Sequence, residues 1–167
     1  MEATAVLQKT IENAEELDIR LEVVGGLTIW EAQPVAKHQK AVMRIGRSIN
    51  PRLGSDGRCG CYWLPDVYIQ FPEGSLKRPD ISIFCREPEQ EDEPITLLPE
   101  AVIEIISKTY EAKDEKIGAP FFIEQGIKDV VLLNPYTGMV THKRRDGEMR
   151  YSSPVEIELE CGCVCTV

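Results

Sequence analysis

The sequence predicts a single domain of the α/β (α+β) class, in which helices flank a central mixed β-sheet. Its segments follow the order helix, strands, buried strand, helix, buried strand. The strand–helix–strand unit at 100–133 is expected to form a right-handed parallel crossover. A chain of 167 residues, 43% hydrophobic and 28% charged, has the length and composition of an ordinary soluble globular domain.

Three elements are expected in the first part of the chain. Residues 2–17 carry apolar side chains at helical spacing, with the acidic side chains elsewhere on that helix. Residues 19–30 contain two apolar runs on either side of Gly25-Gly26, a pattern typical of a β-hairpin. Residues 34–49 predict a second amphipathic helix, because a proline stands where its first turn begins.

The rest of the chain alternates predicted strands with polar turns. Residues 66–71 are an expected strand, and a turn leads from it into the strand that holds Asp80. The acidic segment 87–94 is expected to be a surface connection. The later elements are the strand that holds Glu104, a helix from near Pro120 to a stop at Gly126, a buried strand at 129–133, and two or three C-terminal strands. We expect residues 1–167 to form one unit, with an N-terminal helix at 1–18, a core at 19–160 and a cysteine-rich tail at 161–167.

Two carboxylates in apolar surroundings are the most informative feature of the chain. Asp80 directly precedes the apolar stretch 81–84, and Glu104 lies within the β-branched run 101–106. Burying a glutamate there costs free energy unless something compensates its charge. A divalent cation shared by neighbouring strands would compensate it, so the sequence predicts a Mg²⁺ (or Mn²⁺) site at Asp80 and Glu104. The alternative is that each carboxylate faces water at a strand end.

Hydrolysis at such a site needs a third group that activates or orients water, and in nucleases this group is often a lysine. The position two residues beyond Glu104, on the same strand face, is Ile106. Lys116 and Lys113 follow in the next loop or first helical turn and are the candidates that could fold back over the site. Asp114 is a further candidate, as a ligand or as a group that positions one of these lysines. The alternative is that this whole charged segment is solvated.

Two residues nearer the N-terminus complete the candidate set. His38, at the start of the second expected helix, could sit beside the carboxylates. A histidine in the first turn of a helix is, however, more often a surface or capping residue. Glu31, at the end of the expected hairpin, could add a third carboxylate.

The six cysteines include two paired elements, Cys59-Gly-Cys61 and Cys161-Gly-Cys163. Disulfides are not expected in a chain of cytoplasmic character. The four paired cysteines could bind Zn²⁺ tetrahedrally if the two segments meet, although their one-residue gaps are shorter than those of common zinc sites. The commoner outcome is a buried, reduced cysteine that packs as a small hydrophobe, and Cys85 is expected to be of this kind.

Charge and hydropathy restrict the function classes. The net charge of −9 argues against a large nucleic-acid-binding surface. Two basic clusters could still face a phosphate backbone, and they are Arg44, Arg47, Arg52 and Arg58 in the first and Lys143, Arg144 and Arg145 in the second. No apolar run approaches the roughly 18 residues of a membrane span. Residues 1–5 lack the pattern of a secretory signal, so we expect a cytoplasmic location.

Several segments, in this order along the chain, resemble the Uma-two family of restriction-endonuclease-like proteins in the PD-(D/E)XK superfamily. The resemblance covers roughly residues 20–160, and no one motif in it is decisive. The segments are Trp30-Glu-Ala-Gln-Pro34 followed by His38-Gln39, then Arg78-Pro-Asp-Ile-Ser-Ile83, Leu98-Pro-Glu-Ala-Val-Ile-Glu-Ile-Ile-Ser107, Glu111-Ala-Lys-Asp114 and Gln125-Gly-Ile-Lys-Asp-Val-Val-Leu-Leu-Asn-Pro135.

The resemblance implies a nuclease-type core and assigns metal binding to Asp80 and Glu104. The lysine of the (D/E)XK element is replaced here by Ile106, and the lysine that many family members place in the following helix corresponds to Gly118. Two hypotheses follow, a Mg²⁺-dependent endonuclease that acts on DNA, and a nuclease-fold binding or regulatory module with weak or no catalysis. Exposed edge strands also suggest a homodimer.

Overall fold

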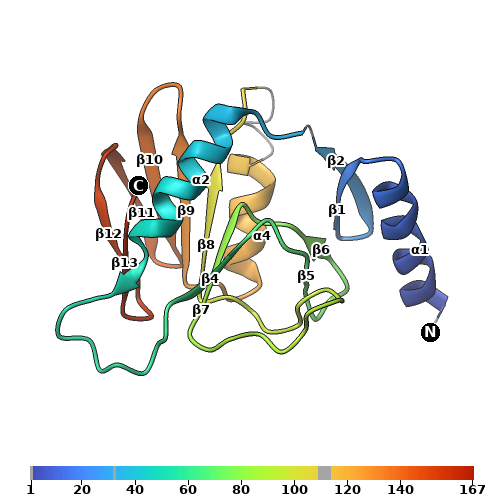
Figure 1. The fold of residues 1–167 in the computed structure, drawn as a ribbon, viewed down its shortest axis with the longest axis horizontal. Helices are drawn as coiled ribbons and strands as arrows, with labels where there is room; N and C mark the ends of the chain where they lie inside the picture. The colour runs from blue at the N-terminus through green and yellow to red at the C-terminus, as the bar shows by residue number, and fades with distance from the viewer. Residues whose placement is uncertain (1, 32, 109–113) are drawn as a thin grey trace.

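The protein, seen in a computed structural model that describes residues 2–31, 33–108 and 114–167, is built around a six-stranded mixed sheet. The order in this sheet is β11-β10-β9-β8-β7-β4 (Figure 1). Its strands are β4 (Tyr62–Pro65), β7 (Ile81–Phe84), β8 (Ala101–Ile105), β9 (Asp129–Asn134), β10 (Met139–Arg144) and β11 (Gly147–Ser152). Only β8 and β9 run parallel within it, and the other neighbours are antiparallel. The expected mixed sheet is therefore confirmed.

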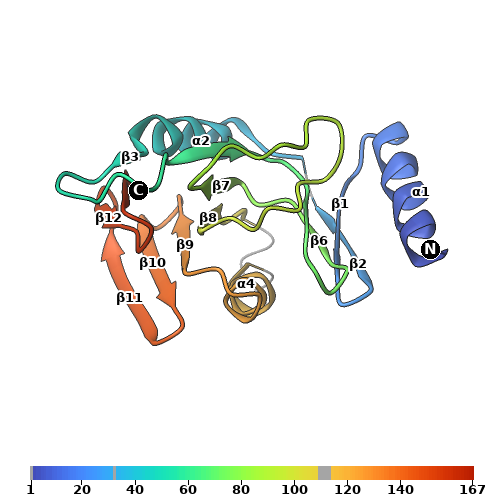
Figure 2. The same cartoon turned by 90° about the horizontal axis from the view of Figure 1, so that it is seen from below.

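Helices cover both faces of this sheet (Figure 2). They are α2 (Ala36–Ser48) on one face and α4 (Ala119–Glu124) on the other, with the π-helix η1 (Asp114–Gly118) leading into α4. Alternate residues of a strand point to opposite faces. On β8, Ile103 and Ile105 accordingly pack into the core cluster of α2, while Val102 packs into that of α4. Glu104 has the parity of Val102 and so belongs to the α4 face.

Two smaller sheets extend the central one. The four-stranded sheet β2-β1-β6-β5 packs against α1 at one end of the molecule (Figure 1). Its parts are α1 (Glu2–Glu16), β1 (Arg20–Val24), β2 (Leu27–Glu31), β5 (Ile69–Gln70) and β6 (Leu76–Lys77). The three-stranded sheet β12-β13-β3 consists of β12 (Glu156–Glu158), β13 (Cys163–Thr166) and β3 (Asn50–Pro51). Residues 161–167 thus contribute the middle strand of a sheet.

The structure differs from the expected elements in four places. The strand expected at 66–71 is reduced to β5, because Asp66 has a positive φ of 54° and turns the chain. The edge strand β4 was not predicted, and Pro65 at its end is a residue that edge strands tolerate. The helix expected near Pro120 is present as α4, but the π-helix η1 before it was not predicted. Four C-terminal strands replace the two or three expected.

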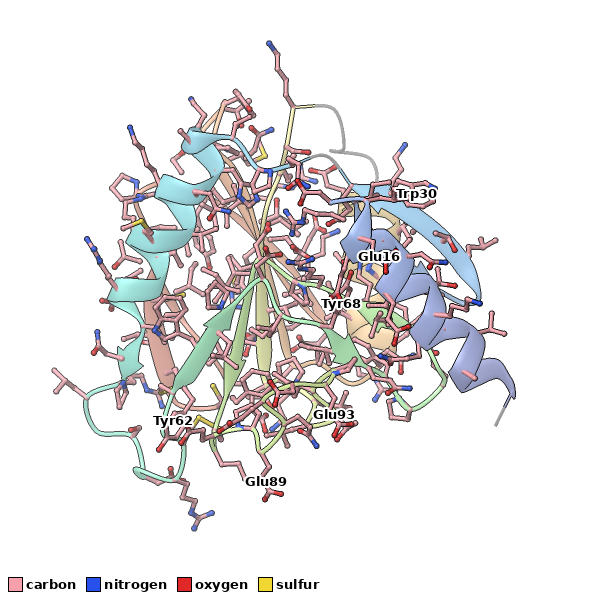
Figure 3. The ribbon with its side chains drawn as sticks, turned by 45° about the vertical axis from the view of Figure 1, so that its right-hand side comes forward. Glu16, Trp30, Tyr62, Tyr68, Glu89 and Glu93 are labelled. Atoms are coloured by element: carbon pink, nitrogen blue, oxygen red, sulfur yellow. A yellow bond between two sulfur atoms is a disulfide. The ribbon has the colours of Figure 1, made fainter. Side chains whose placement is uncertain are left out.

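The segment 87–94 contains no helix or strand and carries exposed acidic side chains, as expected for a surface connection. Glu89 and Glu93 of this segment are exposed at the surface of the protein (Figure 3). None of the described helices combines the length and apolar character that crossing a bilayer requires.

The expectation that the cysteines are unpaired is wrong for four of them. Disulfides join Cys59 to Cys85 and Cys61 to Cys163. The reason is spatial, because the strand pairing of β4 with β7 and the packing of the C-terminal hairpin bring distant cysteines together. Cys161 and Cys165 are free.

Candidate functional site

Asp80, Glu104 and His38 come together at one end of the central sheet. Asp80 directly precedes β7, Glu104 is the fourth residue of β8, and His38 lies in the first turn of α2. Because β7 and β8 are antiparallel, the start of one strand lies beside the end of the other. The fold thus places next to each other two carboxylates that are 24 residues apart in the chain.

Backbone hydrogen bonds hold the two carboxylates in place. The N–H of Asp80 donates to Oε2 of Glu104 at 3.2 Å, and the N–H of Ile105 donates to Oδ2 of Asp80 at 2.7 Å. Each carboxylate therefore accepts from the strand that carries the other. Asp80 is 8% exposed and Glu104 is 7% exposed, so the alternative of two carboxylates facing water does not hold.

His38 is buried against the same carboxylate. Its Nε2 lies 3.0 Å from Oδ1 of Asp80, and the residue is 9% exposed. Its Nδ1 is buried and has no hydrogen-bond partner in the described part of the chain. The surface or capping role is therefore not the one observed, because the first turn of α2 directs this imidazole into the protein.

The donor set of these residues fits a divalent cation. Carboxylate oxygens are the preferred ligands of Mg²⁺, and Mn²⁺ accepts imidazole nitrogen in addition. Asp80 and Glu104 are two buried acidic side chains, each hydrogen-bonded to backbone next to the other, and a cation bound by both would compensate their charges. Oδ2 of Asp80 accepts a backbone N–H, whereas Oδ1 faces His38 and, within the described residues, accepts no backbone N–H, so Oδ1 is the oxygen better placed to become a ligand.

Of the three positions considered for a lysine, the structure describes two. Ile106, in the expected lysine position, is 3% exposed and belongs to the apolar cluster beneath α4. Lys116 lies in η1 with an exposed side chain. Lys113 falls outside the described residues. Asp114 begins η1, and its side chain falls outside the description too.

Glu31 ends the hairpin strand, as expected, and lies beside an arginine. It is the last residue of β2, and its Oε2 lies 3.7 Å from Nη2 of Arg20. An arginine partner therefore already compensates this carboxylate. Its part as a further carboxylate of the site stays a prediction.

Asp66 is a site neighbour that sequence reasoning missed, because it was assigned to the start of a strand. Its backbone N–H donates to the carbonyl oxygens of both Pro79 and Asp80 at 3.2 Å. Its carboxylate binds Arg20 and lies 3.0 Å from Nε of Arg78. Burial raises the pKa of Asp66, and the nearby Asp80 raises it further, against the opposite effect of the two arginines. The positive φ and this pKa shift could not be inferred from its sequence neighbours.

A buried ion pair supports the segment that leads to Asp80. Nζ of Lys77 bonds to Oε2 of Glu22, and both side chains are 1% exposed. Oε1 of Glu22 accepts the backbone N–H of Arg78 at 2.9 Å. Nζ of Lys77 also lies 5.3 Å from the ring centroid of Phe122 on α4, within cation–π distance. These contacts fix residues 77–80 against β1 and α4.

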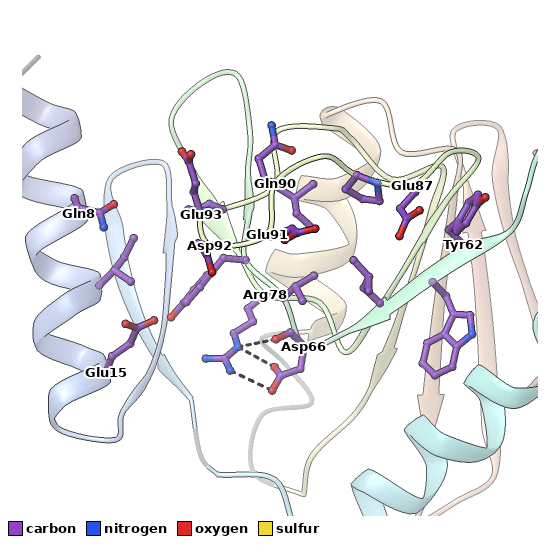
Figure 4. Close-up of a pocket in the computed structure, with 18 residues that line it drawn as sticks. Gln8, Glu15, Tyr62, Asp66, Arg78, Glu87, Gln90, Glu91, Asp92 and Glu93 are labelled. Atoms are coloured by element: carbon purple, nitrogen blue, oxygen red, sulfur yellow. Dashed lines mark hydrogen bonds and ion pairs between the residues drawn. The ribbon is translucent and has the colours of Figure 1, made fainter.

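A pocket of about 700 Å³ adjoins the Asp66–Arg78 pair (Figure 4). Much of its wall is acidic, formed by Glu15 of α1 and by the surface connection that contains Glu87, Glu91, Asp92 and Glu93. Such a wall repels a phosphate backbone. This pocket is therefore unsuited to a polyanionic ligand.

Comparison with known proteins places the chain among nuclease-like folds. Residues 7–160 match the model of the Uma2 family, described as "Putative restriction endonuclease". The crystal structure of a "putative nuclease belonging to DUF820" from Anabaena variabilis ATCC 29413 is similar, with a TM-score of 0.62 and 20% sequence identity. The similarity covers 82% of this chain and 79% of that one. A comparison with curated proteins found no match.

Proposed function

Because the chain belongs to the Uma2 family, we propose that it is a Mg²⁺-dependent (or Mn²⁺-dependent) endonuclease that hydrolyses phosphodiester bonds of DNA. Asp80 and Glu104 are the proposed metal ligands. The observation that carries this proposal is the reciprocal pair of backbone hydrogen bonds, which holds carboxylates from two strands side by side in a buried site. Two carboxylates so placed can share one cation.

A bound divalent cation would lower the pKa of a water molecule and stabilise charge on the phosphate. The chain's own groups must then orient that water and receive its proton. His38 is the proposed acceptor, since its Nε2 faces Asp80 and its buried Nδ1 has no protein partner in the described chain. Lys116 and Lys113 remain proposed as groups that assist by placing positive charge over the site.

The solvent side of α2 supports DNA as the substrate. Four basic residues at helical spacing form a stripe along it, namely Lys37, Lys40, Arg44 and Arg47, and all four are exposed. The last three have no ion pair within the described chain. Lys37 precedes His38, so the stripe begins at the end of α2 that carries the site. A positive stripe is the feature that a phosphate backbone requires on a protein with a net charge of −9.

The other basic residues singled out in the sequence are largely neutralised. Arg52 pairs with Glu158 at 2.9 Å, and Lys143 pairs with Glu148 at 3.3 Å. Nε of Arg144 binds the buried carboxylate of Asp129 at 2.6 Å. The α2 stripe is therefore the better candidate for the DNA-facing surface.

A nuclease-fold module with weak or no catalysis is the second proposed function. It is favoured by the apolar burial of Ile106 and by Gly118 in place of the family's helical lysine. In that case Asp80 and Glu104 would retain a role in metal or DNA binding without turnover.

The deciding experiment is cleavage of supercoiled and single-stranded DNA with added Mg²⁺ or Mn²⁺. The variants are Asp80→Asn and Glu104→Gln, which keep the size of each side chain. Glu100→Gln is the matched control, because Glu100 precedes β8 at its opposite end and pairs with Lys128. Metal-dependent nicking that is lost in both site variants and kept in the control supports the nuclease. Absent nicking, or equal nicking by all four proteins, supports the module.

We also propose a homodimer and a cytoplasmic location. β2 is an edge strand with Leu27 72% exposed and Trp30 53% exposed, and Trp30 lies on the outer side of the hairpin (Figure 3). An exposed apolar edge strand is a suitable surface for pairing with a second copy. Light scattering coupled to size-exclusion chromatography tests the dimer, and cell fractionation tests the location.

A further inference from the structure

Five cysteine sulfurs converge at the end of the central sheet opposite to the carboxylates. The disulfides join Cys59 to Cys85 and Cys61 to Cys163, and Sγ of Cys59 lies 3.5 Å from Sγ of Cys163, which links the two bonds into one cluster. The free Cys161 adds the fifth sulfur, and the Sγ atoms of Cys59, Cys161 and Cys163 all lie within 4.8 Å of one another. Asp80 precedes β7, whereas Cys85 follows it, so the strand separates the two sites.

Disulfide formation accounts for four of these sulfurs but not for the fifth. Cys161 has no bonding partner and nevertheless approaches one sulfur from each disulfide. Cys59 and Cys163 are buried and Cys161 is half-buried, so the three sulfurs form an enclosed group. A group of three or more convergent thiols is what a soft metal ion requires.

The spacing of the sulfurs is compatible with tetrahedral coordination. A Zn–S bond of about 2.3 Å in a tetrahedron separates neighbouring sulfurs by about 3.8 Å. The observed 3.5 Å between Cys59 and Cys163 and the 4.8 Å limit for the trio bracket that value. Small side-chain rotations would therefore bring the three sulfurs to ligand positions.

We propose that the reduced protein binds Zn²⁺ through Cys59, Cys161 and Cys163, with Cys61 or Cys85 as the fourth thiolate. Each of these two is bonded to a member of the trio in the disulfide form, so its sulfur is already adjacent once that bond is reduced. A site closed by four thiolates is structural rather than catalytic.

The zinc site would join the same segments that the disulfides join. Cys59 and Cys61 precede β4, Cys85 follows β7, and Cys161 and Cys163 belong to the hairpin before and within β13. A reducing cytoplasm disfavours disulfides. Zinc would therefore stabilise, in reduced protein, the contact between the three-stranded sheet and the edge of the central sheet.

The test uses the full chain, reduced without metal and titrated with Co²⁺ as a spectroscopic probe and then with Zn²⁺. We expect one Co²⁺ per chain, with thiolate-to-cobalt charge transfer and the intense visible bands of a tetrahedral thiolate site, both lost when Zn²⁺ displaces Co²⁺. Protein oxidised to the two disulfides is expected to show neither signal. Zinc binding should also raise the midpoint of thermal unfolding of the reduced chain.

Alanine variants separate ligands from neighbours. Cys161→Ala leaves both disulfides intact, so it can be purified folded and reduced afterwards, and we expect it to bind Co²⁺ about a hundredfold more weakly. Cys165→Ala is the matched control, because Cys165 is a buried free cysteine of β13, the strand that contains Cys163, and lies outside the trio. At least one of Cys61→Ala and Cys85→Ala should weaken binding similarly.

Three outcomes would overturn the proposal. Reduced wild-type protein could fail to bind either metal, or Cys161→Ala could bind as tightly as Cys165→Ala. Unchanged binding by both Cys61→Ala and Cys85→Ala would rule out the four-thiolate site. None of these results depends on nuclease activity, so the zinc proposal and the nuclease proposal fail separately.

Discussion

Nε2 of His38 lies 3.0 Å from Oδ1 of Asp80, which joins the first turn of α2 to the residue that opens β7. Oδ2 of the same carboxylate accepts the N–H of Ile105 at 2.7 Å. Asp80 is therefore held between a helix on one face of the sheet and a strand within it. This arrangement fixes the orientation of the carboxylate before any substrate binds.

His38→Gln should reduce metal-dependent DNA cleavage by about a hundredfold, the contribution typical of a proton-transfer group. DNA binding should stay unchanged, because the imidazole is buried away from the α2 stripe. Single-turnover cleavage and DNA affinity would be measured side by side. Gln39→Ala is the control, since Gln39 is the exposed neighbour on the same helix. Full cleavage by His38→Gln would remove this residue from the mechanism.

Gly118→Lys should increase DNA cleavage if a missing lysine limits the reaction. Gly118 is buried, and its φ of −65° and ψ of −55° are a helical backbone conformation that lysine also adopts. The charge would enter where many family members carry it. The measurement compares the DNA cleavage rates of wild type and Gly118→Lys, each with and without Glu104→Gln. A gain that survives Glu104→Gln would come from elsewhere, and no gain at all would favour the non-catalytic module.

Lys77→Met should destabilise the protein by about 3–5 kcal/mol, because it removes the cation that pairs with the buried carboxylate of Glu22. The double variant Glu22→Leu/Lys77→Met removes both charges and should recover much of that loss. Urea unfolding of the single and double variants measures the difference. If the single variant is as stable as wild type, the pair has no structural role.

Asp129→Asn should lower the free energy of unfolding at neutral pH and make that free energy less dependent on pH in the acid range. Asp129 is fully buried, and burial alone would raise its pKa, but hydrogen bonds from His142, Arg144 and the N–H of Glu160 outweigh this and lower the pKa below its usual value. A carboxyl group whose pKa is lower in the folded than in the unfolded protein stabilises the folded state. This stabilisation is complete above the unfolded-state pKa of about 3.9 and is lost as the pH falls through the folded-state pKa.

We therefore expect wild type and Asp129→Asn to differ most near neutral pH and to converge below about pH 4. Thermal unfolding across this range is the measurement. Asp56→Asn is the control, because Asp56 is an exposed carboxylate that pairs with Arg58 at the surface. A constant difference between wild type and Asp129→Asn at every pH would mean that ionisation of Asp129 is not the cause.

Neutralising the α2 stripe should weaken DNA binding and its dependence on salt. Each phosphate contact removed lowers the slope of log affinity against log salt by about 0.9. The triple variant Lys40→Gln/Arg44→Gln/Arg47→Gln removes up to three phosphate contacts, so its slope should be smaller by up to about three times 0.9. Arg58→Gln, which removes an exposed arginine already paired with Asp56, serves for comparison. Equal slopes for both variants would place the DNA elsewhere.

Local patterns were enough to predict much of the fold. Apolar spacing anticipated α1, α2 and the hairpin of β1 and β2. Continuous apolar runs anticipated β8 and β9, because these strands are covered on both faces. The same patterns anticipated Asp80 and Glu104 as candidate ligands, since carboxylates in apolar runs are costly without compensation. Their roles remain proposals.

Only the tertiary structure decided which side chains meet. The position of Asp66 beside Asp80, the burial of His38 and the Glu22–Lys77 pair all depend on contacts between segments far apart in the chain, which no local spacing encodes. The cysteines show the same limit, because Cys85 stands alone in the sequence and pairs with Cys59 only through the β4–β7 ladder. Periodicity fixes which face of an element is buried, whereas the partners of a buried polar group depend on how the elements pack.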